Sequence, residues 1–310
     1  MFRVGNVCVG AMGTGSSRIQ TYLVHDYLLN RGIYSNIILP VNQPTTYFDY
    51  YPIINAQDLM GYDIVVFQKV RGNSTFEAIK FCKEHNIISI YELDDWREES
   101  GRVAKQCDYI IVPSEYLKNK MFHSCKNVFV MRHGYEHNQE TYKRQYNYSQ
   151  KVAYVYGCKY IPDTLLPIIQ QSNWQLVTIG RHKTDTYLWH LDTVAQHVVS
   201  CDVGIIPADI STNEGRAKSW NRAILFMSLG LPVIVSAVPE YYNIVKNGVN
   251  GFIAYTEEDW KDYLNILKDK ELCEKMGKQA REDTKHLTTE ACCEQFYTLF
   301  CNIMRKKWLR

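Results

Sequence analysis

The sequence predicts an α/β protein made of two successive doubly wound units, because short apolar runs alternate with longer helical patterns from end to end. Its 310 residues are enough for two domains of ~150 residues each. The alternation stops in a polar stretch at 136–150, rich in Asn, Tyr and Gln, and then begins again. We therefore predict one domain over residues 1–140 and a second over residues 141–310, with a ligand cleft between them and a terminal helix that packs back toward the first domain.

Apolar, often β-branched runs bounded by turn residues give the predicted strands. Gly32 is expected to close the first long helix as its C-cap, and Thr256 with Asp259 forms a predicted capping box before a later helix. Thr288 or Thr289 is expected to open the last helix. The predicted strands are 3–9, 35–39, 63–67, 87–91, 109–112, 128–131, 152–156, 175–179, 203–206, 232–235 and 252–254, and the predicted helices include 18–30, 76–84, 115–121 and 260–267.

Composition narrows the class of protein. The chain is 46% hydrophobic and 22% charged, as is usual for a globular protein with a full core. A formal net charge of +2 gives no overall field toward nucleic acid or an anionic membrane. The chain starts without the apolar segment of a signal peptide, and no apolar run approaches the ~20 residues that span a bilayer. The ten cysteines include no CxxC pair, so we expect free thiols and a cytoplasmic protein.

A glycine-rich turn, GAMGTGSSR at 10–18, lies between the first predicted strand and the following helix. Glycine allows close backbone approach to a ligand, and the N–H groups of a helix start suit phosphate. Ser16 or Ser17 is the expected N-cap. The spacing is neither a full GxGxxG nor a GK[ST] motif, and the alternative is a turn that merely requires glycine. Gly13, Thr14, Gly15 and Ser16 are therefore candidate residues for binding the phosphate of a ligand.

A second candidate site is the helix start in EGRAKSWNRAILFMSLG at 214–230. Ser219 is placed to cap this helix, and Lys218 and Arg222 lie beside its N-terminus. A diphosphate placed there would meet backbone N–H groups and two cations. The alternative is an ordinary surface helix with unremarkable charges. Arg181, after another strand, could approach a phosphate, and Glu240 could bind sugar hydroxyls or cap a helix.

Two carboxylates, Asp94 and Asp95, follow the predicted strand at 87–91, so they should lie at the carboxyl edge of the first sheet. Such groups could bind sugar hydroxyls, orient an acceptor, act as a base or hold a divalent ion. The alternative is an Asp N-cap with solvated charge. We take both as candidate catalytic residues and expect no metal site. The basic segment MRKKWLR at 304–310 could touch anionic lipid headgroups weakly, but a solvated helix end, favoured there by the helix dipole, is the preferred explanation.

The segment from Lys218 to Trp260 resembles the C-terminal domain of retaining GT-B glycosyltransferases of family four. The resemblance implies two Rossmann-like domains, acceptor side first and nucleotide-sugar donor side second, retention of anomeric configuration, no cofactor and no obligatory metal. The matching pieces are Lys218-Ser219, GLPVI at 230–234, Glu240, Asn247-Gly248, NGF at 250–252 and CDVGIIP at 201–207, with looser similarity at 13–18, 62–70, 87–95 and 109–118.

The sequence departs from this family at two acidic positions. The resembling enzymes have a Glu five residues before the GxP glycine, thought to bind the donor ribose, where this chain has Leu225. An earlier Glu of the family falls at Ala217, and Glu214 is a possible substitute. The departure keeps a catalytically silent homologue among the alternatives.

The resemblance and the candidate residues together predict a hexosyl- or pentosyltransferase that uses a nucleotide-sugar donor. Lys218, the helix start at Ser219 and Arg181 would neutralise the diphosphate, and the loop 13–16 would close on it. A glycan or lipid-linked sugar is the favoured acceptor. The alternatives are a phage-type DNA base glycosyltransferase, a nucleotide-sugar epimerase or phosphorylase, and a non-catalytic GT-B-like binding subunit.

Overall fold

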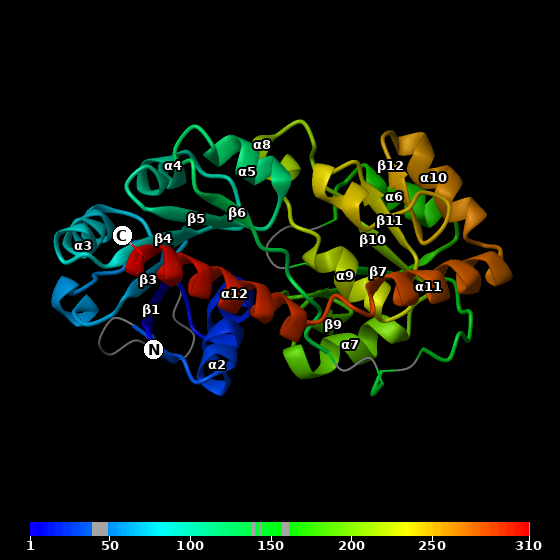
Figure 1. Cartoon of the computed structure of the whole chain (residues 1–310). Helices are drawn as coiled ribbons and strands as arrows, with labels where there is room; N and C mark the ends of the chain where they lie inside the picture. The colour runs from blue at the N-terminus through cyan, green and yellow to red at the C-terminus, as the bar shows by residue number, and fades with distance from the viewer. Residues whose placement is uncertain (39–48, 138–139, 143, 157–160, 310) are drawn as a thin grey trace. The chain divides into compact units, whose positions relative to one another are not determined.

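The computed structural model describes residues 1–38, 49–137, 140–142, 144–156 and 161–309. The chain divides into two compact units, one made of Met1–His133 with Thr289–Arg310 and the other of Gly134–Thr288 (Figure 1). The division lies a few residues before the predicted boundary at 140. The last helix, α12 (Thr289–Trp308), is counted with unit 1 rather than with the second half of the chain. Its apolar side chains are part of the unit 1 core, which explains the assignment.

Unit 1 is built on a six-stranded parallel sheet with the strand order β2-β1-β3-β4-β5-β6. The order reverses between β1 and β3, so the carboxyl ends of these two strands form the switch point at which ligands bind in open α/β sheets. Nearly every side chain in β3 and β4 is buried, as expected for central parallel strands. The strands are β1 (Arg3–Cys8), β2 (Tyr34–Ile37), β3 (Ile64–Gln68), β4 (Ile88–Glu92), β5 (Tyr109–Val112) and β6 (Val128–Val130).

Two helices cover one face of this sheet. Helix α12 lies beside α2 (Leu23–Asn30), and Figure 1 shows it running along the sheet. Cys293, Phe296 and Phe300 of α12 join Leu28 of α2 and residues of β1, β3, β4 and β5 in one apolar cluster. The core of unit 1 therefore needs both ends of the chain. The other helical segments of unit 1 are α1 (Gly15–Ser17), η1 (Arg18–Tyr22), η2 (Ala56–Leu59), α3 (Asn73–Glu84), α4 (Glu98–Ala104) and α5 (Glu115–Met121).

Unit 2 repeats the architecture with a parallel sheet in the order β12-β11-β10-β7-β8-β9. Its switch point lies between β7 and β10. Helices α7 and α9 contribute to the apolar cluster on one face, and α6 and α10 to the cluster on the other. The elements are β7 (Lys151–Val155), α6 (Leu165–Gln171), β8 (Gln175–Gly180), β9 (Tyr187–Leu188), α7 (Leu191–Val199), β10 (Val203–Ile206), α8 (Asn213–Arg216), α9 (Asn221–Ser228), β11 (Val233–Ser236), η3 (Pro239–Asn243), β12 (Gly251–Ala254), α10 (Glu257–Ile266) and α11 (Lys270–Thr284).

A buried ion pair ties the segment before β7 to the body of unit 2. Arg144 Nη2 donates to Asp202 Oδ1 at 2.7 Å, and the two side chains are only 4% and 2% exposed. The other carboxylate oxygen, Oδ2, accepts from the backbone N–H groups of Ser149 at 3.1 Å and Lys151 at 2.9 Å. Arg144 Nη1 donates in addition to the carbonyl of Gly230 at 3.1 Å. Asp202 is therefore paired and hydrogen-bonded on both oxygens, as a buried charge requires.

Helix ends show where local sequence signals hold. Gly32, at φ +75°, follows α2 and donates its N–H to Leu29 O, which confirms the predicted glycine end of that helix. The capping box of Thr256 and Asp259 is also confirmed. Two predicted N-caps are wrong. The first turn of α1 starts after Thr14, so Ser16 and Ser17 lie inside the helix. Helix α9 starts after Trp220 rather than Ser219, and its cap makes no side-chain bond.

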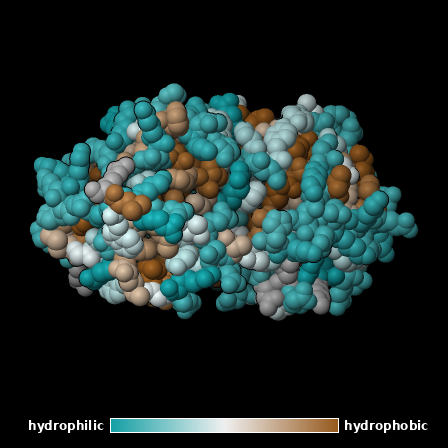
Figure 2. Space-filling view, in the orientation of Figure 1, coloured by the Kyte–Doolittle hydropathy of each residue, from teal (hydrophilic) through white to brown (hydrophobic). Residues whose placement is uncertain are grey.

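The surface gives no sign of a membrane-spanning segment among the described helices, since none is long and apolar enough to cross a bilayer. Figure 2 shows a mostly hydrophilic face with smaller apolar patches on both units. In the described part of the chain all nine cysteines are free, whereas Cys158 lies outside it. The basic turn that ends α12 carries an exposed Trp308.

Candidate functional site

The glycine-rich turn leaves the carboxyl end of β1 and is held by a buried glutamine from β3. Gln68 Oε1 accepts from the backbone N–H of Val9 at 3.2 Å and from Ser17 Oγ at 3.3 Å. The Thr14 N–H donates to Ala11 O at 2.8 Å and closes the turn. The loop is thus placed at the switch point between β1 and β3, where the sequence put it.

Neither central glycine of this turn is required by the packing around it. A Cβ added at Gly13 would meet nothing within 4 Å, and one at Gly15 would meet only Arg18 Nη2 at 3.9 Å. Neither residue has the positive φ that favours glycine. The alternative of a turn that merely needs glycine therefore finds no support in the local geometry. Because Gly13 and Gly15 have no side chain, the backbone of the turn is open and a ligand can approach it closely.

A buried charge cluster follows β3 and β4 at the same edge of the unit 1 sheet. The Lys69 Nζ lies 2.5 Å from Asp94 Oδ1 and 3.1 Å from Asp95 Oδ2. The lysine side chain is 7% exposed and the two carboxylates 17% and 18%. Burial by itself lowers the pKa of Lys69, but the charges of Asp94 and Asp95 outweigh it and raise that pKa above the ordinary value. The candidate catalytic carboxylates are therefore both paired with one ammonium group.

Arg71 belongs to the same charge cluster. Its Nη2 lies 4.0 Å from Asp95 Oδ1, and its guanidinium carbon lies 4.5 Å from the centre of the Tyr50 ring. Neither Lys69 nor Arg71 was among the site residues predicted from the sequence. The available signal was the run QKVRG, in which two cations closely follow the apolar run IVVF, at the edge where parallel strands present their ligand-binding residues. Among the described residues, no three His, Cys, Asp or Glu side chains are grouped so that they could hold a metal ion.

A fully buried carboxyl, Glu92, lies at the end of β4. Its register partners are Gln68 on β3 and Ile111 on β5. Neither carboxyl oxygen has a hydrogen-bond partner among the described residues. Burial, and to a smaller extent the negative charge of Asp94, raises the pKa of Glu92 well above its usual value. The folded protein therefore holds this carboxyl in its neutral form under conditions in which an exposed glutamate is ionised.

Glu92→Gln should make folding less sensitive to pH. Because the folded-state pKa is raised, the parent protein binds an extra proton when folded, and its stability is lost as pH rises above ~4.5 toward that pKa. The glutamine variant lacks this loss. The difference in free energy of unfolding between variant and parent should grow by up to ~1.4 kcal/mol per pH unit from pH ~4.5 up to the raised pKa of Glu92. Urea unfolding at several pH values measures it, and parallel pH curves would contradict a protonated Glu92.

Unit 2 presents its candidate cations around the start of α9. Lys218 Nζ is paired with Glu214 Oε1 at 3.3 Å, and the two side chains are 30% and 29% exposed. The guanidinium of Arg222 lies against Tyr154 on β7, close to the switch point of the second sheet. Burial raises the pKa of Tyr154, and the positive charge of Arg222, together with its hydrogen bonding to the tyrosine, partly offsets the rise. Lys218 and Arg222 therefore flank the helix start as predicted, although Ser219 does not cap it.

The two positions where the resembling family has glutamates carry apolar side chains. Ala217 is fully buried, and Leu225 packs against the apolar cluster on the α9 face. Neither can accept a hydrogen bond from a ribose hydroxyl. Glu214 is the nearest acidic residue in the sequence, and one of its oxygens is already occupied by Lys218.

The weaker candidates of unit 2 have different surroundings. Arg181 is exposed after β8, whereas Glu240 is buried in η3 after β11. Beside Arg181, Gly180 lets the Tyr156 ring lie against the strand, since a Cβ there would be 2.6 Å from the ring. Tyr156 OH donates to Asp185 Oδ1 at 2.5 Å, and His182 stacks on the tyrosine with ring centres 6.0 Å apart. The residues that directly follow β7 and β8 are thus an aromatic ring, Tyr156, and a cation, Arg181.

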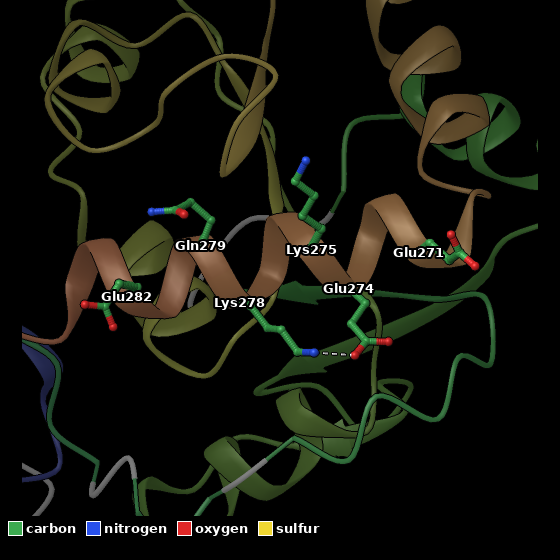
Figure 3. A pocket seen from close by; sticks show the side chains of 6 residues that line it. All are labelled: Glu271, Glu274, Lys275, Lys278, Gln279 and Glu282. Atoms are coloured by element: carbon green, nitrogen blue, oxygen red, sulfur yellow. Dashed lines mark ion pairs between the residues drawn. The ribbon is translucent and has the colours of Figure 1, made fainter.

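A surface pocket elsewhere on unit 2 carries none of these features. Its lining comes from the outward stripe of α11, and Figure 3 shows Lys278 pointing to Glu274, with which it forms an ion pair at 2.6 Å. None of its residues follows a strand, and all are charged or amide side chains. We therefore do not include it in the candidate site. The lining residues are Glu271, Glu274, Lys275, Lys278, Gln279 and Glu282.

Comparison with known proteins gives one family match and many fold matches. Residues 226–283, from α9 through α11, match the family model described as glycosyl transferases group 1. A sequence search of curated proteins finds no match. The resemblance predicted from the sequence is therefore confirmed in the segment that follows the start of α9.

Solved structures match nearly the whole chain at low identity. Anabaena HepE in complex with UDP and glucose has a TM-score of 0.70 and 12% identity, covering 97% of this chain and 100% of that one. Sucrose-phosphate synthase from Thermosynechococcus elongatus has a TM-score of 0.72 and 14% identity, covering 98% and 100%. A glycosyltransferase from Rickettsia africae has a TM-score of 0.67 and 13% identity, covering 98% and 99%. These likenesses confirm the predicted GT-B fold.

Proposed function

We propose that this GT-B glycosyltransferase moves a sugar from a nucleoside-diphosphate donor to a hydroxyl acceptor, with UDP-glucose as the first donor to test. The observation that carries the proposal is the family match, which begins in α9. At the start of that helix stand Lys218 and Arg222, beside the switch point of the unit 2 sheet. The choice of UDP-glucose follows the ligands named for the HepE structures.

The proposed chemistry is electrostatic stabilisation of a departing diphosphate. Lys218, the backbone N–H groups at the start of α9 and Arg222 would neutralise the phosphate oxygens, with Arg181 and the loop 13–16 as further contacts. Glu240 would face the donor sugar after a local rearrangement, since it is buried in this structure. Lys218, Arg222 and the start of α9 are already ordered in unit 2, so these groups would cost little reorganisation when the sugar–phosphate bond breaks.

The resemblance to family-four glycosyltransferases supports four further points about donor side, acceptor side, stereochemistry and metal use. We propose donor binding in unit 2, acceptor binding in unit 1, retention of anomeric configuration and no obligatory metal. The favoured acceptor is a glycan or lipid-linked sugar. Turnover that survives EDTA, and a product whose anomeric proton matches that of the donor by NMR, would support these points.

The first experiment is a thermal-shift screen with UDP, GDP, ADP, CMP and TDP and their common sugar conjugates. A ligand at 100 times its Kd stabilises the folded protein by ~2.7 kcal/mol, which is an easily measured rise in Tm. Release of the nucleoside diphosphate from the ligand that binds then tests turnover. The absence of both binding and release for every nucleotide sugar would reject the proposed function.

A non-catalytic nucleotide-binding subunit is the second candidate, and one observation favours it. Ala217 and Leu225 stand where the family has its two glutamates; Ala217 is fully buried, and Leu225 is partly buried against an apolar cluster. A protein of this kind would bind a nucleotide without releasing diphosphate, even when a broad mixture of acceptors is supplied. Binding without release would therefore select this candidate over the transferase.

Gly15→Ala should lower turnover of a nucleotide sugar at least tenfold without lowering stability. A methyl group at this position has open space, so it should remove backbone freedom from the unfolded chain and stabilise the protein by up to ~1 kcal/mol. It would also push a phosphate away from the loop backbone. Turnover and Tm are measured together. Gly277→Ala is the matched control, because its Cβ would lie 2.2 Å from Gly230 O and should lower Tm. Normal turnover of Gly15→Ala would remove the loop from the donor site.

A further inference from the structure

Lys69 holds the charge cluster of unit 1 from an unusual backbone position. Its φ is +60°, in the left-handed region that costs a lysine roughly 1–2 kcal/mol. The neighbouring Gln68 and Val70 are fully buried, so the strained residue has no freedom to relax outward. Strain of this kind persists only where the surrounding structure holds it, and it is concentrated at ligand sites. In this strained conformation the Lys69 ammonium group forms ion pairs with both Asp94 and Asp95.

Next to Lys69, the opposite charges of Arg71 and Asp95 face each other without a hydrogen bond. Arg71 Nη2 lies 4.0 Å from Asp95 Oδ1, and the arginine side chain is only 7% exposed. Arg71 Nε and Nη2 and Asp95 Oδ1 have no hydrogen-bond partner among the described residues. Buried atoms of charged groups that lack hydrogen bonds lower the stability of the folded protein. A bound ligand group that pairs with these atoms would remove this cost. A group that fits must accept from the guanidinium and donate to the carboxylate at the same time.

We propose that Arg71 and Asp95 form a recognition site for a sugar hydroxyl, with Lys69 as the positioning residue for Asp94 and Asp95. A hydroxyl oxygen can lie within hydrogen-bond distance of both atoms across a 4.0 Å gap, accepting from Arg71 and donating to Asp95. Lys69 and Arg71 balance Asp94 and Asp95, so the cluster carries no net charge and suits an uncharged polyhydroxy compound. The inference rests on the proposed function, in which that compound is the sugar of the acceptor or of the donor.

Three variants test the site, with methyl glycosides of the common hexoses as acceptor probes and UDP-glucose as donor. Arg71→Met keeps a long stem over Tyr50 but loses the donors, Asp95→Asn removes the charge, and Lys69→Met removes the positioning cation. Loss of a hydrogen bond to a charged group should raise KM about 10- to 100-fold. The rise falls on the KM of the glycoside if the acceptor binds here, or on that of UDP-glucose if the donor sugar does. The Kd of UDP alone should change less than twofold.

The KM of the double variant Arg71→Met with Asp95→Asn should be no higher than the higher of the two single-variant KM values, because both groups bind one hydroxyl. Lys69→Arg should recover part of the loss caused by Lys69→Met. KM values at the parental level in both Arg71→Met and Asp95→Asn would overturn the proposal and leave a pair that has only a structural role.

Two further measurements separate this inference from the proposed function. If the parent protein releases no UDP, saturation-transfer NMR of the glycosides still compares binding by the parent and by Arg71→Met, and equal signals would overturn the site. Lys69→Gly and Lys69→Ala remove the same charge and nearly the same side-chain volume, but only glycine relieves the positive φ. The Tm of the glycine variant should be higher than that of the alanine variant by about 2–4 °C. A glycine variant less stable than the alanine variant would contradict the strained role of Lys69.

Discussion

Lys218→Ala is expected to lower turnover of a nucleotide sugar about 100- to 1000-fold, the usual effect of removing one group that stabilises transition-state charge. The fold should survive. The ion pair of Lys218 with Glu214 is partly exposed, and such pairs contribute at most ~1 kcal/mol. Steady-state release of the nucleoside diphosphate measures the loss, and Tm measures the stability of the same samples.

Glu214→Gln is the matched control for Lys218→Ala, because it weakens the same ion pair and leaves the cation in place. It should resemble the alanine variant in Tm but keep turnover within a few-fold of the parent. A similar loss of turnover in both variants would mean that the pair itself, and not the charge of Lys218, is what the reaction needs. Near-normal turnover of Lys218→Ala would remove this residue from the proposed donor site.

Asp202→Asn is expected to destabilise unit 2 by about 3–5 kcal/mol, because it leaves the buried Arg144 guanidinium without its counter-charge. The amide can replace only part of the hydrogen bonding of Oδ1 and Oδ2, which hold Arg144 and the backbone at Ser149 and Lys151. Four of the six tryptophans belong to unit 2, so their fluorescence in urea follows this unit closely.

Glu258→Gln provides the comparison for Asp202→Asn. Glu258 pairs with Lys261 at 3.1 Å in the same unit, but both side chains are at least half exposed. Solvent screens such a pair, and the variant should lose less than ~1 kcal/mol. A loss of less than 1 kcal/mol in Asp202→Asn as well would contradict the importance of the buried clamp.

Much of the fold could be predicted from the sequence, because parallel strands in the centre of a sheet are apolar on both faces and stand out in the chain. The strands at 109–112 and 203–206 and the helix at 115–121 have the predicted bounds. The edge strand β9 was missed, since two residues in TDTYLW carry no periodic signal. The start of the helix predicted at 18–30 is a π-helical turn, which periodicity does not distinguish from α.

The position of a candidate residue in the fold can be predicted where a single rule determines it. Gly13 and Asp94 come after β1 and β4, at the carboxyl edge of the unit 1 sheet, and Lys218 lies just before α9. The partners of these residues could not be predicted in the same way. Lys69 and Asp95 are 26 positions apart, and nothing in either segment indicates that the two side chains meet. The caps were missed because Ser16 and Ser219 are good capping residues that lie one or two positions from the actual helix start.

The discontinuity of unit 1 sets an order for folding during synthesis. Unit 2 is one continuous segment, so it can fold as soon as residue 288 leaves the ribosome. Unit 1 begins the chain but lacks Phe296 and Phe300 of its core until the last helix has been made. The part translated first is therefore completed last, and its apolar sheet face must remain uncovered or chaperoned in the meantime.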